Sequence, residues 1–471
     1  MLGLYGGPIR QLWVLGLLVL LPLGGAVRGA FHLPSLISNT GVSKPQRLPF
    51  EQYAIRHPES RKAVIESLRH YHAGDGRNLH GSPLAGTPRV LRSEIVSDEP
   101  IFPALGNSEC HSSSVTEVAP GVLLAVWFAG TEENAPDVAV FAARSVRGNW
   151  SEPYEVVPPI QRGAVSCGKA LGVRCKGSMS TWNPVVTTLP SGEVLLFYKR
   201  GPSPSEWEGY LTRSRDGGRT WAAEEAMPAG VAGPAKNKPL VLRNGRILAP
   251  ASTEAVGPPN PTGGRERIWK CWVDESLDGG RTWSRRGPIP FEGNMIQPVF
   301  FLGNDGNVRM LARGATELYP NGTPAPTYKD KLNKKHVIHP GKKYMIAATA
   351  DESGDNWLQA HPISLPCPNS GIDAVKLSDG RLLTSFNDMW DTDEELAKTC
   401  PRFRCRLSVA ISNDDGESWS RVVVLADGEG ATLEHSYPAM IQAVDGNVHI
   451  TYTDNRKTIR HVVLDPSHIA W

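Results

Sequence analysis

Polar and charged side chains recur at the ends of six apolar hairpins along the sequence. Each hairpin consists of two short apolar strands joined at a glycine turn. The polar residues stand where the first strand begins and where the second strand ends. In chain order they are His111 with Glu132 and Glu133, Asn183 with Tyr198 and Lys199, Asn237 and Lys238 with Glu254, Gln297 with Arg313, Asp373 with Asn387 and Asp388, and Tyr437 with Asp454 and Arg456. If the hairpins converge, these hydrogen-bonding and charged groups suit a polyhydroxylated or anionic small ligand.

The six hairpins predict strands that are buried on both faces, because both strands of each hairpin are almost continuously apolar. Typical examples are TWNPVVTTLPSGEVLLFYKRG at 181–201 and SYPAMIQAVDGNVHITYTDNR at 436–456. The glycines expected at their turns are Gly121, Gly192, Gly245, Gly306, Gly380 and Gly446.

A second repeat, of the form S-x-D-x-G-x-T/S-W, alternates with these hairpins. It occurs as SRDGGRTW at 214–221, SLDGGRTW at 276–283 and SNDDGESW at 412–419, with weaker copies ending at Trp150 and Trp357. We expect each copy to form the tip of an outer hairpin. The aspartate would accept hydrogen bonds from the turn backbone, the glycine would adopt a positive φ, and the tryptophan would pack underneath. The five tryptophans lie 62–74 residues apart.

Six inner hairpins, five of them followed by an outer hairpin, predict six four-stranded blades. We therefore expect an all-β, six-bladed β-propeller over residues 89–471. The sixth blade would take strands from both ends of this region, RKTIRHVVLD at 456–465 and the segment 90–96. The innermost strands of a propeller surround a central channel, so the polar ends of the hairpins would meet at its mouth. A β-sandwich is the alternative, but it does not explain the regular spacing.

The N-terminal region predicts a secretory signal peptide over residues 1–30. A single arginine precedes an apolar run at 12–23, and small residues follow. The run is shorter than the roughly 20 residues that span a bilayer, and no later run is long enough, so we expect no membrane span after cleavage. A signal anchor is the alternative. Residues 31–88 form an extension in which helical spacing of apolar residues at 64–71 predicts a short helix.

The composition is ordinary for a soluble globular protein. Of 471 residues, 40% are hydrophobic and 21% charged, and the formal net charge of +2 indicates neither a nucleic-acid partner nor a strongly acidic one. Sequons at Asn149 and Asn321 would accept N-linked glycans in a eukaryotic secretory pathway. The basic stretch 329–343 predicts a solvated surface insertion, with a polyanion-binding loop as the alternative.

The cysteines also fit an oxidising compartment. Cys167 and Cys175 are close in sequence, as are Cys400 and Cys405, and we expect each pair to close a local disulfide. A zinc site is the alternative, but no histidine stands at ligand spacing from either pair. The three cysteines left without an expected partner are Cys110, Cys271 and Cys367.

Together the two repeats resemble those of the sialidase (neuraminidase) superfamily, especially its BNR or Asp-box repeat members. The resemblance covers about residues 90–465 and rests on the Asp boxes, the six hairpins in order, and SYPAMIQAVDGNVHITYT at 436–453. It implies a retaining exo-glycosidase that removes a terminal sialic acid. Such enzymes use a tyrosine nucleophile paired with a glutamate, an acid/base on a mobile loop, and three arginines that hold the sugar carboxylate.

The resemblance also implies roles for individual residues. Tyr437, at the start of the last inner strand, matches the nucleophile, and a phenol needs a neighbouring carboxylate to take its proton. Glu133 lies where the acid/base loop is expected, with Glu132 as the nearest alternative. Arg313 matches one carboxylate-binding arginine, and Arg456 would supply a second.

Two positions depart from the family pattern. His111 stands where a sialidase has its first arginine, and Met295 stands near the expected place of the glutamate that activates the tyrosine. We expect Asp373, on the neighbouring blade, to act as the base instead. His111 would act as an acid/base or a ligand donor, or alternatively would have a structural role. Further substrate contacts are expected from Asn183, Lys199, Lys238 and Gln297.

Three functional hypotheses follow. The first is a secreted sialidase-like hydrolase that removes a terminal acidic sugar from a glycan. The second is a polysaccharide lyase in which His111 and Tyr437 move protons beside a uronate that Arg313 neutralises. The third is a propeller that binds glycans without catalysis. No cofactor is expected, because no histidine–carboxylate cluster has metal-ligand spacing and no glycine-rich phosphate-binding motif opens a helix.

Overall fold

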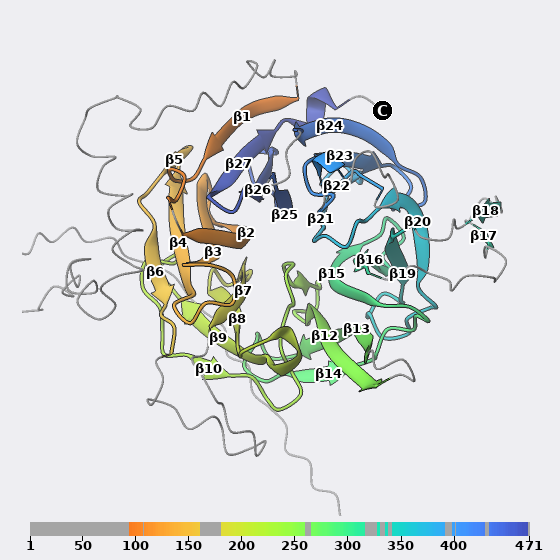
Figure 1. The fold of residues 1–471 in the computed structure, drawn as a ribbon, viewed down its shortest axis with the longest axis horizontal. Helices are drawn as coiled ribbons and strands as arrows, with labels where there is room; N and C mark the ends of the chain where they lie inside the picture. Colours follow the sequence, from red (N-terminus) through yellow and green to blue (C-terminus); the bar gives the residue numbers. More distant parts are fainter. Residues whose placement is uncertain are drawn as a thin grey trace, which may run out of the picture. The chain divides into compact units, whose positions relative to one another are not determined.

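The computed structural model describes residues 94–106, 108–160, 180–259, 265–315, 327–329, 335–337, 342–390, 398–400, 402–428 and 433–469. Nearly all the regular structure within them is β-strand, with two short 3-10 helices, η1 (Pro204–Glu206) and η2 (Pro466–His468). Six antiparallel sheets surround a common axis (Figure 1). The fold is the six-bladed, sialidase-like β-propeller that the two repeats predicted.

The first three blades follow one another along the chain, each with its strands ordered from the axis outwards. The first contains β2 (Glu109–Ala119), β3 (Val122–Gly130), β4 (Ala139–Val146) and β5 (Asn149–Trp150), with β6 (Tyr154–Val157) also paired to β4. The second contains β7 (Thr181–Thr188), β8 (Val194–Arg200), β9 (Glu208–Ser214) and β10 (Glu225–Ala226). The third contains β11 (Leu240–Val241), β12 (Ile247–Pro259), β13 (Arg265–Ser276) and β14 (Ser284–Arg286).

The fourth and fifth blades repeat this order. The fourth contains β15 (Met295–Leu302), β16 (Val308–Gly314), β19 (Tyr344–Thr349) and β20 (His361–Pro366). Between β16 and β19 the chain forms a separate hairpin of β17 (Thr327–Lys329) and β18 (Lys335–Val337). The fifth contains β21 (Asp373–Lys376), β22 (Leu382–Asn387), β23 (Leu407–Ser412) and β24 (Ser420–Ala426).

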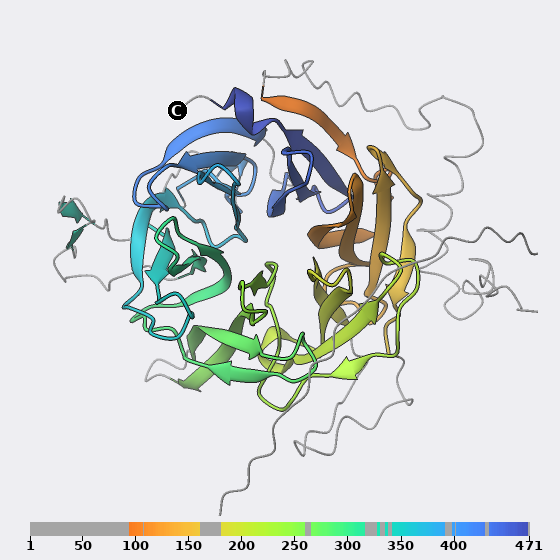
Figure 2. The ribbon, with the colours of Figure 1, turned by 180° about the vertical axis from the view of Figure 1, so that it is seen from behind.

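The sixth blade combines strands from the two ends of the propeller. It contains β25 (His435–Gln442), β26 (Val448–Asp454), β27 (Thr458–Leu464) and, outermost, β1 (Ile95–Pro100). Strand β1 pairs antiparallel with β27, and the two views of the ring show this blade beside the first (Figures 1 and 2). The closure predicted from the segments 90–96 and 456–465 is confirmed, although β1 starts slightly later than expected.

The Asp boxes form the tips of the outer hairpins, as predicted. In the third blade, Asp278 accepts hydrogen bonds from the backbone N–H groups of Arg281 and Thr282 at 3.0 and 2.9 Å. Its other oxygen accepts the Thr282 hydroxyl at 2.6 Å. The Trp283 indole donates to the carbonyl of Gly280 at 2.9 Å. These bonds satisfy the turn locally, so the boxes stabilise the blades and lie apart from the channel.

Four of the innermost strands have a β-bulge near their first residues. Ser112, Asn183, Gln297 and Tyr437 all have a left-handed φ, between 39° and 55°. At each of these sites the pairing of the inner strand with its neighbour shifts register. A bulge redirects one side chain while the strand continues. This device therefore brings residues from separate blades to one end of the channel.

Apolar side chains fill the spaces between neighbouring blades. Between the first and second blades, Leu124 and Val126 of β3 pack in one cluster with Val186 of β7 and Leu196 of β8, all fully buried. Burying a side chain of this kind contributes about 1.5–3 kcal/mol. Similar clusters join the other blades, so the channel residues are held by a rigid ring.

The cysteine predictions have mixed outcomes. Cys400 and Cys405 form the expected disulfide, whereas the expected bond between Cys167 and Cys175 lies outside the described residues. The three cysteines without an expected partner are buried outside any disulfide in the described residues: Cys110, Cys271 and Cys367.

The predictions for the N-terminal region fall outside the described residues. They are the signal peptide at 1–30 and the extension at 31–88 with its short helix, and the sequon at Asn321 is likewise outside. Asn149 is described, and it lies exposed in β5. No helix among the described residues is long and apolar enough to cross a membrane.

Candidate active site

The hydroxyl of Tyr437 is bonded to two side chains of the fourth blade. Arg313, near the end of β16, donates through Nη1 at 2.6 Å, and Gln297 of β15 donates through Nε2 at 3.3 Å. Arg313 Nη1 also donates to Gln297 Oε1 at 3.0 Å. All three side chains are buried. A guanidinium at this distance stabilises negative charge on the phenol oxygen.

The ring of Tyr437 is surrounded by an imidazole and by cations. The His111 ring lies 4.1 Å from it between centroids. The guanidinium carbons of Arg404 and Arg313 lie 5.4 and 5.8 Å from the ring centroid, and the Lys236 ammonium lies 5.9 Å away. These distances are within the range of cation–π attraction. The predicted residues Tyr437, Arg313, Gln297 and His111 are therefore brought together.

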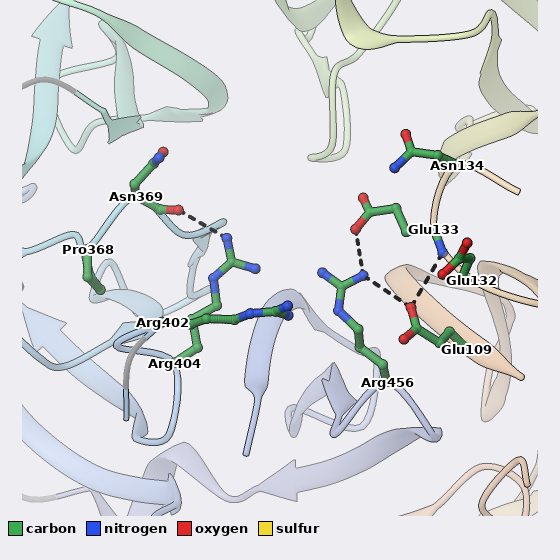
Figure 3. Close-up of a pocket in the computed structure, with 9 residues that line it drawn as sticks. All are labelled: Glu109, Glu132, Glu133, Asn134, Pro368, Asn369, Arg402, Arg404 and Arg456. Atoms are coloured by element: carbon green, nitrogen blue, oxygen red, sulfur yellow. Dashed lines mark hydrogen bonds and ion pairs between the residues drawn. The ribbon is translucent and has the colours of Figure 1, made fainter. Parts of the chain in front are cut away.

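A cavity of about 500 Å³, here called the central cavity, opens beside this group. Figure 3 shows two arginines on one side of it and, on the other, one arginine with three glutamates. The residues that line it are Glu109, Glu132, Glu133, Asn134, Pro368, Asn369, Arg402, Arg404 and Arg456. Tyr437 does not line the central cavity itself, but Arg404 both lines the cavity and covers the tyrosine ring.

Three of these arginines converge on one buried carboxylate, Glu434, which immediately precedes β25. Arg404 and Arg402 donate to it at 2.8 and 3.1 Å, and Arg456 donates at 2.9 Å. Burial by itself raises the pKa of Glu434, but its interactions with His111, Arg404 and Arg456 outweigh burial and hold the pKa well below its usual range. Glu434 is therefore ionised and orients the arginines at the cavity wall.

The segment that carries Arg402 and Arg404 is closed by the disulfide between Cys400 and Cys405. Phe403, between the two arginines, has a left-handed φ of 53°. The side chain of Arg402 is 64% exposed and that of Arg404 is 14% exposed. Arg404 also donates to the carbonyl of Asn369 at 3.1 Å. The segment thus presents one largely exposed and one largely buried guanidinium.

Glu133 lies at the opposite wall of the central cavity, in the turn after β3. Its Oε2 accepts from Arg456 Nη1 at 2.5 Å, and its backbone N–H donates to Glu109 at 3.4 Å. The carboxyl group is about one third exposed. Glu133 and Arg456, which were predicted separately as the acid and as a carboxylate-binding arginine, are thus in direct contact and line the cavity (Figure 3).

Asp373, the residue predicted to act as the base for Tyr437, is bonded to other groups. This buried carboxylate accepts from the Lys238 ammonium at 3.0 and 3.1 Å and from the backbone N–H of Met440 at 2.7 Å. It is therefore bonded to groups other than the Tyr437 hydroxyl, and Lys238 is its ion-pair partner. These bonds connect the third, fifth and sixth blades around the channel. Because the Asp373 carboxylate is already bonded, we do not assign it the role of accepting the proton of the Tyr437 hydroxyl.

His111 is buried and bonded through Nδ1 to the hydroxyl of Thr453 at 2.9 Å. Burial and then the charge of Arg456 lower its pKa well below the usual value of 6.5. The imidazole is therefore neutral at physiological pH. This state suits packing against Tyr437 better than proton donation.

Asn183 and Lys199 bond to backbone in the same loop. Asn183 donates to the carbonyl of Ala235 at 3.2 Å, and the ammonium of Lys199 donates to the carbonyl of Pro234. Burial lowers the pKa of Lys199 to about 7. Both side chains hold the loop after β10, and neither lines the central cavity.

One further carboxyl group lies near the Tyr437–Arg313 pair. Burial raises the pKa of Glu254 in β12, while the charges of Arg313 and Arg267 act in the opposite direction and the charge of Glu133 adds to the increase. Among the described residues, its carboxyl group has no hydrogen-bond partner.

Sequence reasoning missed Arg402, Arg404 and Glu434. The available signals were the basic run PRFRCR at 401–406, inside the predicted disulfide, and the glutamate in LEHSYP at 433–438. Among the described residues, no cluster of histidine, cysteine, aspartate and glutamate side chains is arranged to hold a metal ion.

Comparison with known protein families assigns the chain to a family. The model of the BNR repeat-like domain matches residues 121–321 and 333–450. The chain belongs to the BNR repeat-like family. This assignment agrees with the Asp boxes and confirms the resemblance to BNR-repeat sialidase-like proteins.

Individual relatives of this BNR repeat-like protein are distant. A sialidase from Micromonospora viridifaciens is 25% identical over 264 residues, which cover 52% of this chain and 36% of the relative. The chain thus spans about a third of that curated protein's length.

Solved structures support the fold. A protein of unknown function from Dyadobacter fermentans matches with a TM-score of 0.56 at 16% identity, covering 79% of this chain and 98% of the other. The NanB sialidase of Streptococcus pneumoniae matches with a TM-score of 0.53 at 12% identity, covering 79% and 71%. At this identity the matches show that the BNR repeat-like chain shares the sialidase propeller.

Proposed function

We propose that this protein is an exo-glycosidase that removes a terminal acidic sugar, sialic acid or a related sugar acid, from a glycan. The observation that carries the proposal is the hydrogen bond of 2.6 Å between Arg313 and the Tyr437 hydroxyl, beside a cavity walled by arginines. Two of the relatives described above, from Micromonospora viridifaciens and Streptococcus pneumoniae, are named sialidases, which favours the same substrate class.

The acidic group of the sugar would bind to Arg404 and Arg456. Guanidinium groups suit carboxylate capture, because their paired N–H donors match the two carboxylate oxygens. Both arginines are held by Glu434, so little side-chain freedom is lost on binding. The more exposed Arg402 would contribute long-range attraction.

Chemistry would proceed in two displacements. The Tyr437 oxygen attacks the anomeric carbon while the bond to the leaving oxygen breaks, and that oxygen takes a proton from Glu133. Water then attacks the same carbon, gives its proton to Glu133, and releases Tyr437. The phenol proton would pass to Glu254, because burial raises the pKa of that carboxyl group.

Glu133 must be protonated to serve as the acid, yet Arg456 contacts it in the unliganded protein. A substrate carboxylate that engages Arg456 would compete for this guanidinium. Binding of the acidic sugar would therefore release Glu133 from its ion pair with Arg456. This coupling favours acidic over neutral terminal sugars.

The decisive experiment screens sialosides, ketodeoxy-sugar glycosides and uronate oligosaccharides for release of a new reducing end. We expect release from one of the first two classes, and loss of that activity in Tyr437→Phe. Tyr154→Phe is the matched control, because its hydroxyl bonds only a backbone carbonyl of an outer turn. Full activity in Tyr437→Phe would refute the proposed nucleophile.

A second comparison separates the two carboxyl groups. Glu133→Gln should lose activity on an oligosaccharide but keep it on an aryl glycoside, whose leaving group needs no proton. Glu254→Gln should lose activity on both substrates. If Glu254→Gln kept activity on the aryl glycoside and Glu133→Gln lost activity on both substrates, Glu254 would be the acid and Glu133 the acceptor of the phenol proton.

Non-catalytic glycan binding is the second candidate function. One observation favours it: no described carboxylate is bonded to the Tyr437 hydroxyl. Binding of an acidic sugar without any released product would establish this alternative. The lyase alternative would produce an unsaturated uronate that absorbs ultraviolet light, and the neutral, Thr453-bonded state of His111 speaks against it.

The apolar run near the N-terminus and the exposed sequon support the proposal that the protein is secreted. Expressed in eukaryotic cells, it should appear in the medium with a glycan on Asn149. Removal of N-glycans should lower its mass, and Asn149→Gln should reduce that change.

A further inference from the structure

One loop, residues 367–372 and here called the crossing loop, connects the fourth blade to the fifth. It leaves β20, the outermost strand of one blade, and enters β21, the innermost strand of the next, so it runs from the rim of the propeller to the central channel. Two of its residues, Pro368 and Asn369, line the central cavity. None of the functional steps above uses a side chain of this loop.

The side chain of Asn369 is bonded to the guanidinium of Arg313. Arg313 Nε donates to Asn369 Oδ1 at 2.9 Å. The Nη1 atom of the same guanidinium donates to the Tyr437 hydroxyl and to Gln297 Oε1, at 2.6 and 3.0 Å. A guanidinium is planar, and its N–H groups have fixed directions. An acceptor at Nε therefore determines where Nη1 points, so Asn369 holds Arg313 in the orientation that reaches the Tyr437 oxygen.

The backbone of Asn369 is bonded to a different arginine. Its carbonyl accepts from Arg404 Nη2 at 3.1 Å (Figure 3). Arg404 is the arginine to which we assign the acidic group of the sugar, and its guanidinium carbon lies 5.4 Å from the centre of the Tyr437 ring. Asn369 thus contacts both the arginine at the phenol oxygen and an arginine of the cavity wall.

The crossing loop is itself held in place. Asn369 has a left-handed φ of 52°, which asparagine adopts more readily than most residues with a side chain. Its N–H donates to the carbonyl of Cys367 at 2.6 Å. At Gly371 a Cβ atom would lie 3.0 Å from Lys236 Cε and 3.1 Å from Tyr437 Cγ. The loop therefore packs directly against the tyrosine, and a hydrogen bond from it fixes the position of a partner relative to the phenol ring.

We propose that Asn369 is a positioning residue for the nucleophile. Its side-chain oxygen keeps the Arg313 guanidinium at the Tyr437 hydroxyl, and its carbonyl keeps Arg404 at the wall of the central cavity. The inference rests on the proposed function for the roles of these two arginines. Because the two bonds use different atoms of Asn369, loss of the side chain releases Arg313 and leaves Arg404 in place. Such a loss impairs the chemical step rather than the capture of the sugar acid.

Two substitutions at Asn369 test this separation. Asn369→Gly removes the amide but allows the positive φ, and Asn369→Asp keeps an oxygen that accepts from Arg313 Nε. On an aryl sialoside we expect kcat of Asn369→Gly to fall about tenfold and KM to change less than about twofold, because Arg313 is no longer aligned with the phenol oxygen. Asn369→Asp should keep most of the wild-type kcat. An unchanged kcat in Asn369→Gly, a rise in KM as large as the fall in kcat, or an equally low kcat in Asn369→Asp would overturn the inference.

Crystal structures of the wild type and of both variants test the geometry without catalysis. In Asn369→Gly we expect Arg313 Nη1 to lie beyond hydrogen-bonding distance of the Tyr437 oxygen, and in Asn369→Asp to remain within it. Arg404 should keep its bond to the carbonyl of residue 369 in both variants. An unmoved Arg313 in Asn369→Gly would contradict the positioning role. If the wild type hydrolyses no substrate, the proposed function fails, while these structures still decide whether Asn369 positions Arg313.

Discussion

Arg313 of the fourth blade donates a hydrogen bond of 2.6 Å to the hydroxyl of Tyr437 in the sixth blade, 124 residues further along the chain. Tyr437 lies at the bulge near the start of β25, and Arg313 lies next to the last residue of β16. Both side chains are buried. The bond places a permanent positive charge at the oxygen that we propose as the nucleophile.

Replacing Arg313 should therefore impair the chemical step. In Arg313→Lys we expect kcat to fall about 10²-fold, because an ammonium cannot reproduce the two bonds to the Tyr437 and Gln297 oxygens. KM should change less. Steady-state kinetics with an aryl sialoside measure both constants, and an unchanged kcat would be incompatible with this role.

Arg404 and Arg402 should differ in their effect on binding. Arg404 is mostly buried and bonded to both Glu434 and Asn369, so Arg404→Ala should raise KM about 10–100-fold. Arg402 is largely exposed, and Arg402→Ala should raise KM less than tenfold, with an effect that disappears at high salt. Similar effects of the two substitutions at low and high salt would contradict the assignment of Arg404 to the carboxylate.

The disulfide between Cys400 and Cys405 should matter for both stability and binding. It closes a short loop, and the chain-entropy estimate for such a loop is about 2 kcal/mol. The double variant Cys400→Ser, Cys405→Ser should lose about this much stability in urea unfolding, and its KM should rise because Arg404 is less well held. Dithiothreitol should affect wild type in the same way and leave the double variant unchanged. A normal KM in the reduced protein would show that the bond does not position Arg404.

Acid should destabilise the sixth blade through His461. This buried residue is bonded to His449 at 3.0 Å and accepts from the Trp150 indole at 3.3 Å. Burial, followed by the neighbouring His449, lowers its pKa to about 3. Between about pH 6.5 and pH 3, His461 binds a proton in the unfolded chain but not in the folded protein. The free energy of unfolding therefore decreases as the pH falls through this range, by up to about 1.4 kcal/mol per pH unit.

Urea unfolding at pH 7 and pH 5 measures this dependence. His461→Gln should show a smaller loss of stability between the two pH values than wild type. His468→Gln, at an exposed site, is the control and should behave like wild type. Identical pH dependence in His461→Gln and wild type would exclude the buried histidine as the cause.

The fold could be predicted from sequence because each repeat contains its own turn chemistry. The serine, aspartate and glycine of each Asp box satisfy one another within eight residues, as Asp278 and Thr282 show. The six inner hairpins, which alternate with the boxes, then predicted the number of blades. The pairing of β1 with β27 was also predictable, because only one blade lacked a fourth strand.

The site was predicted only in part, because position along a strand does not determine which partner a side chain meets. Tyr437 and Arg313 were assigned to one site, and they are bonded. Asp373 was expected beside Tyr437, but a nearby ammonium, Lys238, binds its carboxylate more favourably than a neutral phenol would. Glu434 precedes its strand and carries no repeat signal, so its role was visible only when three arginines met it in space.

Direct labelling of the nucleophile tests the central claim most directly. The protein is incubated with a fluorinated sialyl fluoride, which forms the covalent intermediate but is released slowly, and is then digested and analysed by mass spectrometry. The account predicts one added glycosyl group, on the peptide and side chain of Tyr437, and none in Tyr437→Phe. A label on any other residue, or turnover of the substrate with no label on Tyr437, would contradict it.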